Sequence, residues 1–253
     1  MSIAGIRINQ PFNNDALSVG GSRAEALIGD VHLVNWFQAD PRSVDLDGAE
    51  IISFSDKKGT GAKFTRATSA NSATLVNGLF GIYPGARFNA SESDKSVFSG
   101  AAANLSLPFT WAGVATLNNN AAAANLMGTF TSTTVRSILN VSGGAAAMRL
   151  QFGTVSTGAL AIPIGEPFAF AAGFDGTNIF LMVNGAVSVV AAAGAPSISA
   201  LSLGALPGGG QFWDGNVSDI FICDVALNSS APAATALLSK IRGFTQRAYG
   251  LSA

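Results

Sequence analysis

The residue types that most often carry chemistry are few in this chain and rarely stand close together. Its one histidine, His32, has no serine or aspartate partner at the spacing of a catalytic triad, and its one cysteine, Cys223, lies in an apolar strand sequence. The densest acidic group, Asp45, Asp47 and Asp56, could offer oxygen ligands to calcium. We interpret it instead as ordinary turn chemistry. The sequence therefore predicts no catalytic residue, no metal site and no cofactor.

Aromatic rings that could stack on a sugar are the remaining candidates for a binding site. Trp213 follows the glycines at 208–210 and precedes Asp214, so it is the tryptophan best placed to expose its ring. Packing of this ring under a loop is an equal alternative. Trp36 and Trp111 are embedded in apolar strand sequences and are predicted to lie in the core. We place the candidate ligand-binding residues at Trp213 and Asp214, with a glycan as the possible ligand.

Charged residues are few and unevenly distributed along the 253-residue chain. They make up 11% of it, against about 25% in an ordinary soluble protein, and the formal net charge is −1. Residues 96–135 and 176–213 contain none. The lack of a basic face argues against nucleic acid and against a membrane surface as partners, and asparagines interrupt the first uncharged stretch too often for a membrane span. Such a surface tolerates close, permanent neighbours, which favours a homo-oligomer.

The first 30 residues lack sustained periodicity and contain several turn formers, so 1–30 is predicted to be an arm outside the core. Ile3, Ile6, Arg7 and Ile8 are the expected anchors of this docking arm on a neighbouring protein or subunit. The segment has no basic stretch followed by an apolar one. We therefore expect no secretory signal and predict assembly in the cytoplasm of a host cell.

Residues 31–253 are predicted to form one domain, because apolar and polar residues alternate with the period of a β-strand in many segments. Asn184 and Gly185 separate two β-rich runs and predict a hairpin, since a type I′ turn needs positive φ at both central positions. One helix is predicted at about 230–247, capped by a serine and with Pro232 in its first turn. About a dozen strands and one C-terminal helix indicate an all-β fold, a jelly-roll β-sandwich.

Two passages of the sequence carry recognisable motifs. The first contains VNWFQAD (34–40), IISFSDKKGTG (51–61) and ARFN (86–89), and the second contains VNG (183–185), LG (203–204) and FWDGNVSDIFICDVALN (212–228). Over roughly 31–250 the chain resembles concanavalin A-like (laminin-G-like) jelly-roll domains of bacteriophage type, as in virion decoration and tail-associated proteins. The resemblance implies a concanavalin A-like sandwich. It also implies a structural role for Asp219, which matches a family aspartate and would hold backbone or loop N–H groups.

The functions that the resemblance implies are varied, because such sandwiches serve as lectins, glycan hydrolases, adhesion modules and virion parts. The hydrolases that it resembles carry Glu-x-Asp-x-x-Glu, whereas Glu92 and Asp94 are followed here by Val97 at the third carboxylate position. We therefore predict a non-enzymatic phage virion protein, a capsid decoration (cement) or head/tail accessory protein, whose partners are capsid or tail proteins and sister subunits. The alternative is a carbohydrate-binding receptor or host-adhesion module of a tail fibre or spike.

Overall fold

The structure is a computed structural model that describes residues 24, 26–68, 72–90, 96–100, 108–194 and 201–251. The predicted arm anchors Ile3, Ile6, Arg7 and Ile8 lie outside the described residues, as do Glu92 and Asp94. No helix in the described ranges is long and apolar enough to cross a membrane.

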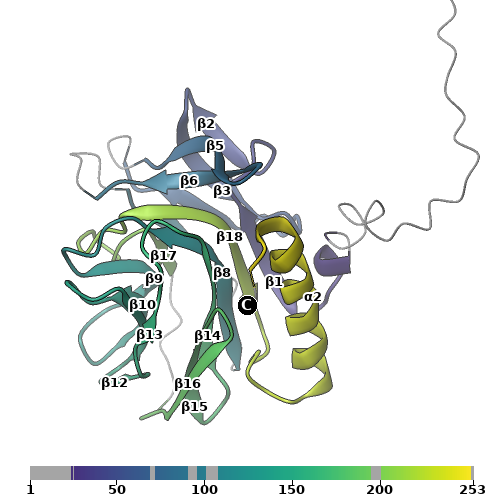
Figure 1. The fold of residues 1–253 in the computed structure, drawn as a ribbon, viewed down its shortest axis with the longest axis vertical. Helices are drawn as coiled ribbons and strands as arrows, with labels where there is room; N and C mark the ends of the chain where they lie inside the picture. The colour runs from purple at the N-terminus through teal and green to yellow at the C-terminus, as the bar shows by residue number, and fades with distance from the viewer. Residues whose placement is uncertain are drawn as a thin grey trace, which may run out of the picture.

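Antiparallel strands form two layers that enclose one core (Figure 1). Pairing in the first layer runs through β16 (Ala186–Ala191), β15 (Asn178–Val183), β14 (Phe168–Phe174), β8 (Phe109–Leu117), β18 (Gly215–Cys223) and β1 (Leu33–Gln38). In the second layer it runs through β2 (Val44–Asp47), β3 (Glu50–Ser55), β4 (Lys63–Arg66), β7 (Phe98–Gly100), β17 (Leu201–Leu203), β9 (Ala124–Phe130), β10 (Arg136–Val141) and β11 (Ala147–Phe152).

The two layers are continuous at one side. Hairpin β5 (Thr74–Phe80) and β6 (Tyr83–Phe88) pairs with β3 and with β18, and so joins them. The short strands β12 (Val155–Ser156) and β13 (Leu160–Ala161) pair with β11. The structure thus confirms the predicted all-β sandwich. The hairpin between β15 and β16 is also confirmed, with φ of 46° at Asn184 and 86° at Gly185.

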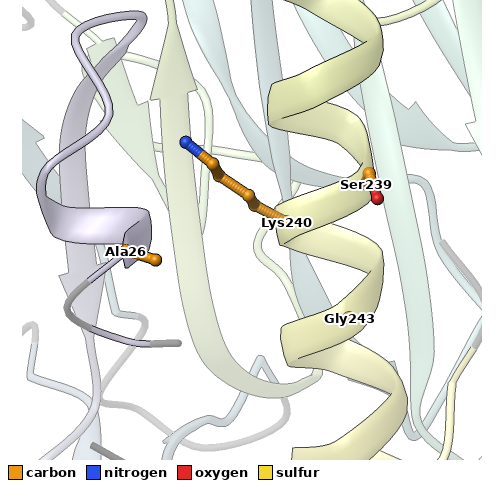
Figure 2. Close-up of a pocket in the computed structure, with 4 residues that line it drawn as sticks. All are labelled: Ala26, Ser239, Lys240 and Gly243. Carbon is orange, nitrogen blue, oxygen red and sulfur yellow. The ribbon is translucent and has the colours of Figure 1, made fainter. Parts of the chain in front are cut away.

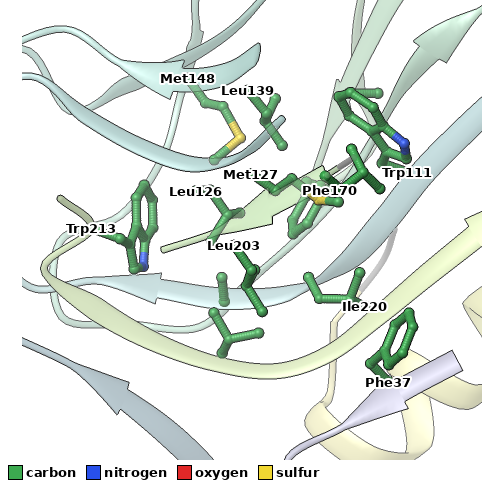
Figure 3. Close-up of a cluster of buried hydrophobic side chains, with 14 of the residues drawn as sticks. Phe37, Trp111, Leu126, Met127, Leu139, Met148, Phe170, Leu203, Trp213 and Ile220 are labelled. Atoms are coloured by element: carbon green, nitrogen blue, oxygen red, sulfur yellow. The ribbon is translucent and has the colours of Figure 1, made fainter. Parts of the chain in front are cut away.

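The main core lies between the layers, where the strands turn alternate side chains inward. Figure 3 shows Trp111, Phe170 and Ile220 of the first layer on the same cluster as Met127 and Leu139 of the second. All five side chains are at most 1% exposed. The aromatic and branched residues that give these strands their pattern therefore supply most of the driving force for folding.

A second apolar cluster covers the outer face of the first layer beneath helix α2 (Pro232–Tyr249). Leu237 and Ile241 lie one helical turn apart and are buried against that face. The helix begins two residues later than predicted, and the expected serine cap is absent because Ala231 is the N-cap. Pro232 occupies its first turn, and Gly250, at φ 70°, ends it in the left-handed conformation.

The described end of the predicted arm belongs to the domain, which corrects the boundary at residue 30. Residues 24 and 26–28 form a helical turn, and Leu27 is fully buried in the cluster beneath α2. Asp30, at 8% exposure, accepts a hydrogen bond from the Lys240 ammonium at 2.6 Å. The sequence missed this docking because a single turn is too short to show helical periodicity.

Candidate functional site

Trp213 is not a surface platform. Its side chain is 1% exposed, and its indole Nε1 donates a hydrogen bond to the backbone oxygen of Thr116 at 3.1 Å. Figure 3 shows the ring among the buried side chains of the main core cluster. The prediction of an exposed ring is therefore wrong, and the alternative, packing under a loop, is correct. Trp36 and Trp111 lie in the core as predicted, both fully buried.

Asp214, the second predicted ligand residue, lies in a small surface hollow of about 120 Å³, here called the Asp214 hollow. Asn119 and Phe212 line it together with four alanines, at positions 90, 121, 122 and 124. The residues come from the segment just after β6, from the β8–β9 connection with the first residue of β9, and from the segment before β18. Three parts of the chain that are distant in sequence thus meet at one point on the surface.

The polar groups of the Asp214 hollow are held in place. Burial raises the pKa of the half-buried Asp214 carboxyl, and a hydrogen bond from the Asn119 side chain partly offsets that rise. The Asn119 Oδ1 in turn accepts the backbone N–H of Ala121 at 2.9 Å, which fixes the orientation of the amide. The backbone N–H of Asn118 donates to the backbone carbonyl oxygen of Asp214 at 2.8 Å and joins the two segments. An acid and an amide are therefore presented in a defined geometry.

The segment before β18 is held by a buried amide from β9. Asn125 is fully buried, and its Nδ2 donates to the side-chain Oε1 of Gln211 at 2.7 Å. Its backbone N–H donates to the backbone carbonyl oxygen of Gln211, also at 2.7 Å. Gln211 takes φ of 48°, a left-handed conformation that is uncommon outside glycine. Such a strained backbone persists where its surroundings hold it, so the position of Phe212 is set by Asn125.

These groups suit a hydroxyl-bearing ligand. A carboxylate accepts hydrogen bonds from hydroxyl groups, and an amide can both donate and accept. The half-buried Phe212 supplies an aromatic surface, and alanine walls let a ring approach closely. The sequence predicts Asp214 as a ligand residue, which stays a prediction, and it does not single out Asn119 or Phe212, which lie beside Asp214 in the structure. The run of three asparagines at 118–120 was the available signal, since such residues occupy loops between strands.

The buried Asp219 has a structural role, although not through the partners expected. Its Oδ1 accepts the Trp36 indole N–H at 2.7 Å, and its Oδ2 accepts the Tyr249 hydroxyl. Both partners are side chains rather than backbone or loop N–H groups. Burial raises the pKa of this carboxyl, with the Tyr249 and Trp36 hydrogen bonds acting in the opposite direction.

The acidic group near β2 and β3 is engaged in local contacts. Asp56 accepts the Trp36 backbone N–H at 2.8 Å and the Thr60 hydroxyl at 2.6 Å, while Asp45 accepts Ser53 at 2.5 Å. Burial would raise the pKa of Asp56, but its several hydrogen bonds lower it overall. Within the described ranges no three His, Cys, Asp or Glu side chains are grouped as a metal site would require.

A second hollow, of about 200 Å³, lies between α2 and the N-terminal turn (Figure 2). Ala26, Ser239, Lys240 and Gly243 line it. Lys240 points toward the N-terminal turn and forms an ion pair with Asp30, so its ammonium holds the end of that turn against α2. The Asp214 hollow is the better candidate for ligand binding because its acid, amide and ring converge on one space.

No protein-family model and no curated protein matches the chain. Solved structures do match. One is Trypanosoma rangeli sialidase in complex with the inhibitor DANA, at TM-score 0.55 and 17% identity over 81% of this chain and 32% of that one. Another is the binding domain of botulinum neurotoxin DC in complex with SialylT, at TM-score 0.57 and 10% identity over 83% of this chain and 52% of that one.

A third match is a structure of botulinum neurotoxin type C, whose cell entry depends upon interaction with two ganglioside molecules. Its TM-score is 0.59, at 10% identity over 85% of this chain and 53% of that one. The chain thus spans about a third of the sialidase and about half of the toxin structures. At these identities the similarity establishes a common β-sandwich fold and no more.

Proposed function

We propose that this chain is a carbohydrate-binding domain and that the Asp214 hollow takes one sugar residue. The observation that carries the proposal is the convergence of the Asp214 carboxylate, the Asn119 amide and the Phe212 ring in one hollow. The structural neighbours support it, because they include a toxin domain in complex with SialylT, a toxin whose cell entry depends on gangliosides, and a sialidase in complex with the inhibitor DANA. Concave sites with a few fixed polar groups and an aromatic surface are typical of small-ligand binding.

The charge of the Asp214 hollow favours a neutral sugar. Asp214 is the one charged residue among the described residues that line it. A carboxylated sugar such as sialic acid would place a second negative charge beside this acid, in a partly desolvated position where repulsion is strengthened. We therefore expect a neutral hexose at the end of a glycan to bind in preference to a sialylated one.

Binding without hydrolysis is the activity we propose. Glycoside hydrolysis normally uses two carboxyl groups, about 5 to 10 Å apart, on either side of the scissile bond. Asp214 is the one carboxyl among the described lining residues of the hollow. Incubation of the protein with neutral and sialylated oligosaccharides, followed by product analysis, should release no sugar. Catalytic release that Asp214→Ala abolishes would show that the domain is a hydrolase.

A glycan array followed by calorimetry tests the binding proposal. Asp214→Ala and Phe212→Ala should each weaken binding of a neutral glycan at least tenfold. Asp47→Ala removes an exposed acid elsewhere, and Ile82→Ala removes an exposed apolar side chain, so both should bind as the parent does. Failure of the parent protein to bind any array glycan at millimolar concentration would overturn the proposal.

The role as a phage virion component, with capsid or tail proteins as partners, stays a prediction. It rests on the sequence resemblance and on the sparse charge of the chain. Host adhesion through a glycan would reconcile it with the Asp214 hollow. Mass spectrometry of purified particles from the source of the gene, together with immunogold labelling, would decide whether and where the protein is on a virion.

A further inference from the structure

Among the residues that the structure describes, β16 is the last strand of the first layer and has a paired strand on one side only. Among the described strands β16 pairs with β15 alone, from Asn178 opposite Ala191 to Val183 opposite Ala186, without a register shift (Figure 1). A regular edge of this kind presents backbone N–H and C=O groups that a further strand can pair with.

The two faces of β16 differ. Val190 packs against the main core, and the Ser188 hydroxyl accepts the Gly158 backbone N–H at 2.9 Å, so these residues face inward. Val187 and Val189 are 52% and 49% exposed. They pair across the strands with side chains of the cluster beneath α2, namely Met182 and Phe180. The two valines therefore lie on the same face of the sheet as the cluster beneath α2, but they are not covered as that cluster is.

Within β16 itself, as the structure describes it, no lysine, proline or bulge opposes pairing with a further strand. Proteins commonly place lysine, proline or a bulge on an exposed edge strand. The sequence of β16 is AVSVVA, and the whole stretch 176–213 contains no charged residue. Two copies of such a strand can approach each other without electrostatic repulsion, which makes a second copy of the chain the best-matched partner.

We propose that two copies of this chain associate through β16, paired antiparallel about a two-fold axis at Ser188. Residues directly opposite each other in an antiparallel pair face the same side of the sheet. The axis at Ser188 places Val187 of each copy opposite Val189 of the other, so the dimer contains two such pairs. Four exposed valines then become one apolar patch, and Ala186 lies opposite Val190 on the inner face. A shift by one residue would set outward residues against inward ones.

The interface is isologous, because each copy contributes the same strand in the same way. It makes the first layer continuous across the dimer. The proposal is independent of glycan binding, since none of the residues lining the Asp214 hollow belongs to β16.

Sedimentation equilibrium of the full chain tests the association. The parent should have the mass of a dimer, and the double variant Val187→Lys/Val189→Lys should have the mass of a monomer at the same concentration. Ile82→Lys changes another exposed apolar side chain, 89% exposed, and should remain dimeric. Circular dichroism should show all three folded. A parent that is monomeric at millimolar concentration, or a lysine double variant that stays dimeric, would overturn the proposal.

Cysteine cross-linking tests the register. An equal mixture of Val187→Cys and Val189→Cys proteins should form a disulfide-linked dimer on mild oxidation, because these positions are opposite each other. Each variant alone should cross-link at least tenfold less, since its own cysteines are diagonal, beyond the usual span of a disulfide. The native Cys223 is buried and should not compete. Equal cross-linking in the mixture and in either single variant would refute the two-fold at Ser188.

Discussion

The indole Nε1 of Trp36 donates a hydrogen bond to the Oδ1 of Asp219 at 2.7 Å, and both side chains are fully buried. The other carboxylate oxygen accepts the hydroxyl of Tyr249, which lies at the end of α2. The Lys57 ammonium lies 4.4 Å from the centre of the Trp36 ring, and its positive charge favours the ionised form of Asp219. Burial lowers the pKa of Lys57 itself. One buried acid thus connects β1, β18 and the C-terminal helix.

Asp219→Ala should destabilise the domain by about 2 kcal/mol at neutral pH. The substitution leaves the Trp36 N–H and the Tyr249 hydroxyl without their acceptor, at about 1–3 kcal/mol each, while the loss of a buried charge partly offsets this. Urea unfolding followed by tryptophan fluorescence measures the change. Asp45→Ala is a matched control at a more exposed acid and should cost about 0.5 kcal/mol. Equal stability of Asp219→Ala and the parent would contradict the assigned role.

The pKa of Asp219 predicts how the stability of the parent and of Asp219→Asn diverges with pH. Burial raises this pKa above its ordinary value of 3.8, so the stability linked to its protonated form is fully present below 3.8 and is lost as pH rises through the folded pKa. The asparagine variant does not titrate there. Its unfolding free energy relative to the parent should therefore increase from pH 4 upward until the folded pKa is passed.

Denaturant titrations of the two proteins at several pH values measure that difference. Subtraction matters because Asp30 and Asp175 have lowered pKa values, and their stabilisation is present above 3.8 and lost as pH falls through their folded pKa. These opposite contributions are common to both proteins and cancel in the difference. A difference that does not change with pH would show that Asp219 is not the titrating group.

Removal of residues 1–30 should destabilise the domain, whereas removal of 1–23 should not. The longer deletion removes Leu27, which is fully buried beneath α2, and Asp30, which accepts the Lys240 ammonium. Loss of a buried leucine side chain costs about 2–5 kcal/mol. Thermal unfolding of the two truncated proteins and of Leu27→Ala checks this. If both truncated proteins unfold at the same temperature as the parent, the N-terminal turn contributes nothing to the stability of the domain.

Much of the fold could be predicted because local pattern and burial agree in the long strands. The β-rich runs at 109–117, 147–152, 168–174 and 215–223 predict strands, and β8, β11, β14 and β18 have those bounds. In contrast β9 was missed, because it is buried on both faces and its sequence, ANLMGTF, shows no alternation. The short strands β4 and β7 pair with each other across 32 residues or more of chain, and pairing at that distance leaves no trace in local periodicity.

The candidate site shows the limit of sequence patterns more clearly. A tryptophan beside glycines indicates exposure only on average, and whether Trp213 or its neighbour Phe212 faces outward depends on the parity with which the segment enters β18. Buried Asn125 fixes that parity through Gln211, from a strand 86 residues away in the chain. The position of Asp214 could be predicted, but the grouping of Asn119 and Phe212 around it depends on tertiary contacts.

Alanine substitutions at the two adjacent aromatic residues should therefore separate stability from binding. Trp213→Ala removes a buried ring and the hydrogen bond to Thr116, at about 3–5 kcal/mol, so its unfolding midpoint should fall sharply. Phe212→Ala removes a half-buried ring and should cost about 1 kcal/mol, while it should weaken neutral-glycan binding at least tenfold. Unfolding curves and calorimetry on both variants provide the comparison. If Trp213→Ala is as stable as the parent but loses binding, the tryptophan rather than the phenylalanine contacts the sugar. The proposed role of Phe212 in the binding site would then be wrong.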